Sequence, residues 1–312
     1  MPTPLFVFGI ARSGTTHLAN LLLRHPEIAG IEHEKHGGIH ESGYFSFVDG
    51  RYGNLEEPAN FIEFANVTAA SDYFRLVGAD LKLIYSLYPA SYEEVFRFVM
   101  DRYAQEQNAR YWIEKTPLHT LSAVSIARYY PDALFITIER NTKEVVASKM
   151  RMLEVLASQK DEVPNKSERC FIIATQVITW QHYKNAILDL TAKYPDRTIS
   201  INFEDLREKK ETVMRKLCDF LRIDFQPRVL ESPYPVNSSF QNDPIDARNN
   251  IFSRREEQFL ETCRFVAKKM PKQFLQLAYK LGTFRLRREG LPSWFFKLDP
   301  NSGESLKDKL LE

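Results

Sequence analysis

Short apolar runs alternate along the chain with longer amphipathic segments. The apolar runs have the length and composition of buried strands, and they occupy residues 5–9, 111–113, 134–139 and 198–203. Apolar residues recur at helical spacing between them, in residues 16–24, 91–103, 118–130, 142–150, 173–190 and 213–221. Strands that alternate with helices in this way predict an α/β fold, with a central parallel β-sheet flanked by helices on both faces.

Two parts of the chain depart from this alternation. Residues 37–66 are rich in glycine, asparagine and aromatic side chains and show weak periodicity, which favours an active-site insertion. Residues 283–312 form a basic, aromatic tail, which we expect to pack against its own domain or a subunit partner rather than a membrane. Residues 1–282 are therefore predicted to form a single domain that includes the insertion and is followed by the tail.

Composition excludes several classes of protein. The 312 residues carry 42 Lys and Arg against 41 Asp and Glu, so no overall field attracts nucleic acid or an anionic membrane. Any anion site must therefore be local. The three cysteines are far apart and have no CxxC spacing, which argues against a disulfide framework or a structural zinc site. No apolar stretch is long enough for a membrane span, and we expect a cytoplasmic protein.

The first predicted strand leads into a glycine loop, GIARSGTT, at residues 9–16. Successive backbone N–H groups and the N-terminus of the following helix converge there, an arrangement that binds phosphate. The Walker A pattern requires a lysine after the second glycine, but Thr15 follows Gly14, and the cation of the loop is Arg12. The loop therefore predicts a phosphate site that is poorly suited to nucleoside triphosphate chemistry.

A second candidate anion site lies in ERNTKEVVAS, residues 139–148. Arg140 follows a buried strand, and its planar guanidinium suits phosphate oxygens, while Ser148 adds a hydroxyl donor from the next helix. The carboxyl ends of neighbouring parallel strands meet at one edge of a sheet. The two sites together therefore suit a nucleotide that is phosphorylated at both its 5′ and its 3′ position.

These segments resemble the 5′-phosphosulfate loop and the 3′-phosphate element of the sulfotransferases that use 3′-phosphoadenosine 5′-phosphosulfate (PAPS). The resemblance extends through KTP at residues 115–117, INFEDL at 201–206 and VNSSF at 236–240. It implies the P-loop-type sulfotransferase fold and an enzyme that moves a sulfuryl group from PAPS to a hydroxyl of a small molecule or a glycan, releasing adenosine 3′,5′-bisphosphate. The chain is more similar to the carbohydrate, tyrosine-protein and bacterial members than to the cytosolic aryl members.

The resemblance also implies roles for individual residues. Arg12 and Lys115 match the cations that neutralise the bridging oxygen as the 5′-phosphate departs. The residues matched to donor binding are Arg12, Ser13, Gly14, Thr15 and Thr16 at the 5′-phosphate, Arg140 and Ser148 at the 3′-phosphate, and His17, Ser238 and Phe240 at the adenine.

Transfer also needs a general base for the acceptor hydroxyl. The stretch HPEIAGIEHE, residues 25–34, resembles the segment in which the carbohydrate-modifying members place a glutamate, and an ungapped match puts the base at Glu34. Glu32 and His33 are adjacent alternatives, and Glu41 is a further one if the loop has an insertion. The histidine role of the cytosolic members is not transferred, because Pro117 occupies its position.

No metal site is expected. His33, His36 and His40 are close in sequence, but the two glycines between His36 and His40 disfavour the helix that would aim both rings at one metal. A clamp of Arg and Lys on the leaving phosphate does not require Mg²⁺. Two other functions stay open: a P-loop kinase, which would need a loop lysine and a Mg²⁺-binding aspartate, and a homologue that binds the nucleotide without transferring sulfate.

Overall fold

Five parallel strands form the central sheet of the computed structural model, which describes residues 1–158, 164–234, 251–282, 291–296 and 298. Their order across the sheet is β2-β5-β1-β6-β7. The strands are β1 (Thr3–Phe8), β2 (Ile28–Ala29), β5 (Tyr111–Glu114), β6 (Leu134–Glu139) and β7 (Thr198–Asn202). Because β1 pairs with β5 on one side and β6 on the other, it is the central strand. The predicted parallel sheet is confirmed.

Both faces of this sheet are buried, because neighbouring residues of a strand point to opposite faces. In β1, Leu5 and Val7 belong to one apolar cluster, while Phe6 and Phe8 belong to another on the opposite face. Helices α1 (Thr15–Leu22) and α11 (Lys210–Leu221) contribute to the first cluster, and α6 (Tyr92–Glu106) and α7 (Ala123–Tyr129) to the second. The alternation along one short strand therefore anchors helices on both sides, as the sequence predicts.

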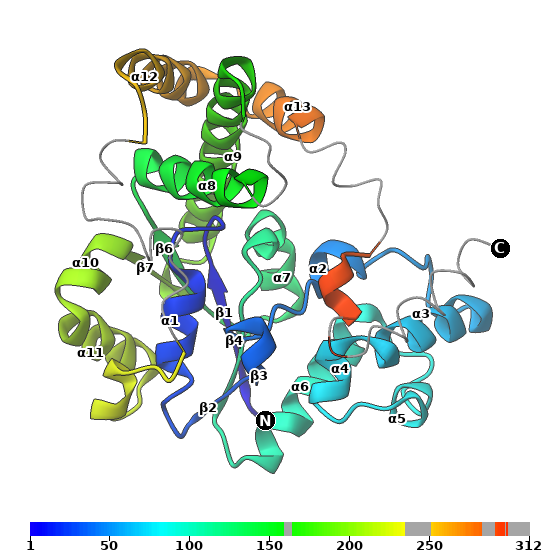
Figure 1. Cartoon of the computed structure of the whole chain (residues 1–312). Helices are drawn as coiled ribbons and strands as arrows, with labels where there is room; N and C mark the ends of the chain where they lie inside the picture. The colour runs from blue at the N-terminus through cyan, green and yellow to red at the C-terminus, as the bar shows by residue number, and fades with distance from the viewer. Residues whose placement is uncertain (159–163, 235–250, 283–290, 297, 299–312) are drawn as a thin grey trace.

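Beside the sheet lies a group of short helices that includes part of the insertion (Figure 1). These helices are α2 (Tyr44–Phe47), α3 (Pro58–Ala70), α4 (Asp72–Leu76) and α5 (Leu81–Tyr85). Phe45, Phe61 and Phe64 are almost fully buried and join the same aromatic cluster as Phe96 of α6. Residues 44–47 and 58–66 of the insertion are therefore helical, and their buried aromatic side chains belong to the core.

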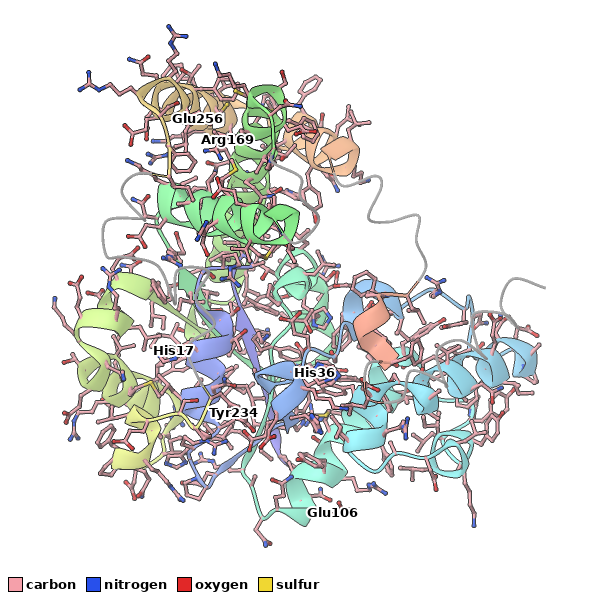
Figure 2. All side chains as sticks on the ribbon, in the orientation of Figure 1. His17, His36, Glu106, Arg169, Tyr234 and Glu256 are labelled. Carbon is pink, nitrogen blue, oxygen red and sulfur yellow. The ribbon has the colours of Figure 1, made fainter. Side chains whose placement is uncertain are left out.

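Four helices pack together at the other end of the molecule, at the top of Figure 1. They are α8 (Thr142–Ser158), α9 (Lys166–Lys193), α12 (Arg254–Lys269) and α13 (Lys272–Gly282). Arg169 of α9 forms ion pairs with Glu154 of α8 and, at 2.6 Å, with Glu256 of α12 (Figure 2). The division of the chain into residues 1–282 and a tail stays a prediction.

The remaining described elements are short. They are the antiparallel hairpin of β3 (Glu32–His33) and β4 (Gly38–Ile39), helix α10 (Phe203–Glu208), and the 3-10 helices η1 (Glu34–His36), η2 (Pro117–Ser122), η3 (Pro195–Arg197), η4 (Pro227–Leu230) and η6 (Ser293–Phe296). The predicted helix over residues 118–130 thus begins as η2. Within the described part of the chain, every helix is too short or too polar to span a membrane.

Candidate active site

The glycine loop connects β1 to α1 in the conformation of a phosphate cradle. Gly14 precedes the helix with φ of 94°, and Arg12 also has a positive φ, of 75°. The hydroxyl of Ser13 donates to the carbonyl of Ile10 at 2.7 Å, which holds the turn closed. The helix that follows has no side-chain cap, so its first backbone N–H groups are available to an anion.

Phe203, the first residue of α10, packs directly on this loop. A Cβ placed on Gly14 would lie 2.3 Å from its ring, so only glycine fits there. The guanidinium of Arg140 also lies over the Phe203 ring, 4.4 Å from the ring centroid. Phe203 therefore joins the two predicted anion elements. Sequence analysis places Phe203 in the INFEDL segment but gives it no role. Gly14 is the signal that could have pointed to it, because a glycine before a helix often marks a close packing partner.

The two predicted anion elements touch each other. Nε of Arg12 donates to the hydroxyl of Ser148 at 3.1 Å, although the two residues are 136 positions apart. Nη1 of Arg140 donates to the backbone carbonyl of Arg12 at 2.9 Å, and its other nitrogens bind Glu144. These contacts follow from the pairing of β1 with β6, whose carboxyl ends carry the two elements.

Positive charge is concentrated and partly dehydrated around the loop. Burial, and then repulsion from Arg140, lowers the pKa of Arg12. Burial, and then repulsion from Arg12, lowers the pKa of Lys149, the residue after Ser148. Cations that repel one another in a half-buried site favour an anion that binds between them. Lys149 is a further candidate site residue that sequence analysis does not identify, although it directly follows Ser148.

Lys115 reaches the loop from the end of β5. Its side chain is 1% exposed, and Nζ donates to Oγ1 of Thr16 at 3.1 Å and to Oε1 of Glu41 at 2.6 Å. The Glu41 side chain is 35% exposed, so the carboxylate is open to solvent while the ammonium is not. The predicted cation and one of the four candidate bases therefore lie together beside the phosphate loop.

A buried hydrogen-bond network fixes the segment that carries Glu41. Oε1 of Glu114 accepts from the hydroxyls of Ser42 at 2.8 Å and Thr116 at 2.6 Å. Oε2 lies 2.9 Å from Nδ1 of His119, whose Nε2 accepts the backbone N–H of Phe45. Because Nε2 accepts, Nδ1 is the ring nitrogen that donates to Glu114.

The charge state of Glu114 follows from the same network. Burial opposes the ionised carboxylate, but interaction with His119 and the hydrogen bonds outweigh it and lower the pKa of Glu114. His119 is fully buried and so holds the loop in place rather than facing an acceptor. None of the predicted site residues belongs to this network, although one member, Thr116, lies in the matched KTP segment at residues 115–117.

The other candidate bases lie farther along the β3–β4 hairpin. Glu34 is exposed in η1, Glu32 forms an ion pair with Arg24, and Nδ1 of His33 accepts the backbone N–H of Lys35 at 3.2 Å. These contacts are with Lys35 of the hairpin and with Arg24, which follows α1, and none of them is with Lys115. The geometry thus favours Glu41, while the choice of Glu34 stays a prediction.

Of the three residues predicted to contact the adenine, the structure describes one. His17 is half-buried on α1 (Figure 2), and burial, followed by the nearby charge of Lys210, lowers its pKa. Its ring is therefore neutral near pH 7, the form in which it stacks without adding charge. Ser238 and Phe240 lie outside the described residues, and their role stays a prediction.

A known protein family matches most of the segments described above. The family model described as "Sulfotransferase family" matches residues 4–227, which include β1, the glycine loop, β5, β6 and β7. Comparison with curated proteins finds no match.

Several solved structures are similar at low sequence identity. A sulfotransferase domain from the curacin biosynthetic pathway is 18% identical, with a TM-score of 0.49 over 93% of this chain and 99% of that domain. The corresponding domain of the Synechococcus PCC 7002 olefin synthase is 17% identical, with a TM-score of 0.49 over 93% and 96%. Sulfotransferase STF1 from Mycobacterium tuberculosis is 13% identical, with a TM-score of 0.43 over 89% and 76%.

The family match spans the segments that form the phosphate loop, the Lys115 site and the Arg140 element. From residue 4 to residue 227, the chain belongs to the sulfotransferase family and is a sulfotransferase enzyme.

Proposed function

We propose that this sulfotransferase uses PAPS as its donor and transfers the sulfuryl group to a hydroxyl of a small molecule or a glycan. The observation that carries this proposal is the hydrogen bond from Arg12 to Ser148. It joins a loop suited to a 5′-phosphate to an element suited to a 3′-phosphate. A donor with phosphate groups at both positions uses both halves of this site, whereas a simple nucleoside triphosphate uses one.

The residues present fit such a donor. The loop supplies the uncapped N–H groups at the start of α1, and Arg12, Lys115, Arg140 and Lys149 supply positive charge around it. Arg140 is held by the Arg12 carbonyl and by Phe203, so its guanidinium plane is fixed before a ligand arrives. A fixed, partly dehydrated cation stabilises a phosphate more than a mobile surface cation does.

In the transfer step, the S–O bond to the 5′-phosphate breaks and a new S–O bond forms to the acceptor oxygen. The electron pair of the broken bond stays on the phosphate oxygen, where Arg12 and Lys115 stabilise the developing charge. Glu41 accepts the proton of the acceptor hydroxyl, because it is the candidate carboxylate that lies beside Lys115 and is open to solvent. The loop N–H groups hold the departing phosphate in place.

Two cations of this site already contact a carboxylate, which competes with an anion for them. Lys115 is bound to Glu41, and Arg140 is bound to Glu144. A phosphate that takes Lys115 as its counterion weakens the hold of Lys115 on Glu41. Donor binding therefore loosens this ion pair, which allows the Glu41 carboxylate to contact the acceptor hydroxyl.

Two residues that a P-loop kinase needs, the loop lysine and the Mg²⁺-binding carboxylate, are missing from the described part of this site. The loop has no lysine at the Walker position, and the residue at the end of β6 is Glu139, which binds Lys184 at 3.1 Å instead of facing the loop. Mg²⁺-dependent phosphoryl transfer needs a carboxylate that is directed at the metal and the phosphates. A cytoplasmic location stays a prediction.

Calorimetric titration with adenosine 3′,5′-bisphosphate and with ATP, each with and without Mg²⁺, tests the donor proposal without knowledge of the acceptor. We expect the bisphosphate to bind at least tenfold more tightly than ATP and equally well in EDTA. A preference for Mg²⁺-ATP would overturn the proposal. A chain that binds the bisphosphate but hydrolyses or transfers no sulfate from PAPS would instead be a silent nucleotide-binding homologue.

A further inference from the structure

Three side chains from two distant segments meet beside the β3–β4 hairpin. His36 ends η1, His40 follows β4, and Asp72 begins α4 in the neighbouring helical group. One potential ligand atom from each lies within 4.8 Å of the other two. The imidazole rings of His36 and His40 stack at 3.6 Å between centroids, and Nε2 of His36 lies 3.5 Å from Oδ2 of Asp72. Figure 2 shows His36 where the hairpin faces these helices.

The carboxylate of Asp72 is buried with one oxygen unsatisfied. The residue is 0% exposed, and His40 is 2% exposed. Oδ2 accepts the backbone N–H of Leu298 at 2.9 Å, but no hydrogen-bond donor within the described ranges reaches Oδ1. A buried carboxylate oxygen that lacks a partner is costly, so its position points to a cationic ligand that binds there.

Two imidazole nitrogens and a carboxylate oxygen are a recognised donor set for divalent transition metals. Zn²⁺ accepts both of these ligand types at about 2.0–2.2 Å and takes a water molecule as its fourth ligand. Mg²⁺ and Ca²⁺ prefer all-oxygen sites and fit this set poorly. The stacked rings need only to rotate about their side-chain bonds to bring both nitrogens to one metal, because the three atoms are already grouped.

We propose that His36, His40 and Asp72 form a binding site for a divalent transition metal, with Zn²⁺ as the best match. Sequence analysis dismisses a metal here because Gly37 and Gly38 prevent a helix. The structure brings the rings together by another route: the chain turns at Gly37, with φ of 72°, and returns through β4. The third ligand, Asp72, comes from a segment with no sequence proximity to the histidines.

The site connects the segment that carries Glu41 to the helical group beside the sheet. His40 directly precedes Glu41, the carboxylate that binds Lys115, and Asp72 belongs to the helical group beside the sheet. A metal that binds both segments ties the position of Glu41 to that group. Residues 34 and 35 beside His36 are exposed, which gives a metal a route from solvent. The metal takes no part in the proposed transfer step and acts by holding this loop.

Metal binding to the full chain can be measured directly. Protein stripped with EDTA and dialysed is titrated calorimetrically with Zn²⁺, and the bound metal is counted by elemental analysis after gel filtration. We expect one equivalent of Zn²⁺ and a rise in the thermal unfolding midpoint when Zn²⁺ is added. His36→Gln and Asp72→Asn should each weaken binding at least tenfold. His182→Gln, which removes a histidine on α9, should leave it unchanged.

Co²⁺ provides a second readout that does not depend on stability. A tetrahedral site of these ligands gives visible absorption bands when Co²⁺ replaces Zn²⁺, and the bands should disappear in the His36→Gln variant. His36 is chosen because it is less buried than His40, so its substitution leaves the core intact. The absence of stoichiometric Zn²⁺ and of Co²⁺ bands in the folded wild-type chain would overturn the proposal. His36 and Asp72 would then be an ion pair only. None of these measurements depends on the donor or on sulfate transfer.

Discussion

Lys115 and Glu41 lie 2.6 Å apart, with the ammonium buried and the carboxylate open to solvent. The lysine contacts the glycine loop through Thr16, while the glutamate side chain is exposed to solvent. One ion pair thus connects the two halves of the proposed reaction. Its two members have opposite expected effects on donor binding, which makes them separable by substitution.

Lys115→Met should lower kcat by about 100- to 1,000-fold, because it removes a cation that stabilises the leaving phosphate. Methionine fills the space of the buried stem, so the fold should survive. Steady-state kinetics with PAPS, alongside thermal unfolding, measures both effects. The control is Lys272→Met, which removes an exposed lysine paired with Asp189 on the far helices. A folded Lys115→Met enzyme with unchanged kcat would contradict the role.

Glu41→Gln should lower kcat by about 100-fold or more while nucleotide affinity stays the same or rises, since Lys115 loses its competing carboxylate. Glu34→Gln is the matched comparison, because it makes the same change at an exposed site. We expect it to stay within about twofold of wild type, as surface substitutions usually do. If Glu34→Gln instead abolishes transfer and Glu41→Gln does not, the general base is Glu34.

Arg140→Ala should weaken binding of adenosine 3′,5′-bisphosphate by about 10- to 100-fold, the effect of one lost charge-assisted phosphate contact. Binding of adenosine 5′-monophosphate should change much less, because it lacks the 3′-phosphate. Calorimetry with both ligands measures the difference. Arg207→Ala, which breaks an exposed pair with Glu208, serves as the control. Equal losses for both nucleotides would remove the 3′-phosphate assignment.

Gly14→Ala should destabilise the fold by about 2 kcal/mol, because the new Cβ meets the Phe203 ring and the backbone keeps a positive φ. Gly50→Ala separates the two causes, since Gly50 has φ of 74° but no atom within 4 Å of the added Cβ. Phe203→Leu should recover part of the loss in the Gly14→Ala background. Urea unfolding of this double-mutant cycle measures the coupling, and purely additive effects would exclude the contact.

Glu114→Gln should cost about 2 kcal/mol at pH 7, because a buried carboxylate with several hydrogen bonds becomes neutral. The folded pKa of Glu114 lies below its usual value of 4.5, so its stabilising effect is complete above pH 4.5 and is lost as pH falls through the folded pKa. Wild type should therefore lose more stability on acidification than the variant. Urea midpoints between pH 7 and pH 3 test this, with exposed Glu211→Gln as control; parallel curves would contradict it.

The strands β1, β5, β6 and β7 could be predicted from the sequence, and so could the contact between the two candidate anion elements, because each depends on local pattern. The run at residues 134–139 is β6 without any change of bounds, and the elements after β1 and β6 meet because parallel neighbours share an edge. The short edge strand β2 gives no such signal, since two residues carry no periodicity. The helix α3 is missed for a related reason: its buried aromatics resemble those of an irregular aromatic loop.

The proximity of Glu41 to Lys115 could not be predicted, because it depends on the path of a hairpin. An ungapped match favours Glu34, yet β3 and β4 fold back and place Glu41 next to Lys115. That path is held by Glu114 and His119, which lie more than seventy positions away and contact backbone groups. Such contacts leave no local pattern, and the same is true of Phe203 above Gly14.

The strand order of the sheet also affects how this chain folds during its synthesis. β1 is the earliest strand in the chain but the central one, and Thr3 pairs with Tyr111 while Leu5 pairs with Leu134. A nascent chain on the ribosome therefore exposes the TPLFVF segment until both of its neighbours have been synthesised. Strand pairs between residues so distant in sequence form slowly, and the unpaired, apolar edges of β1 stay exposed until then. We expect the young chain to depend on chaperones, and every fragment that ends before β6 to aggregate.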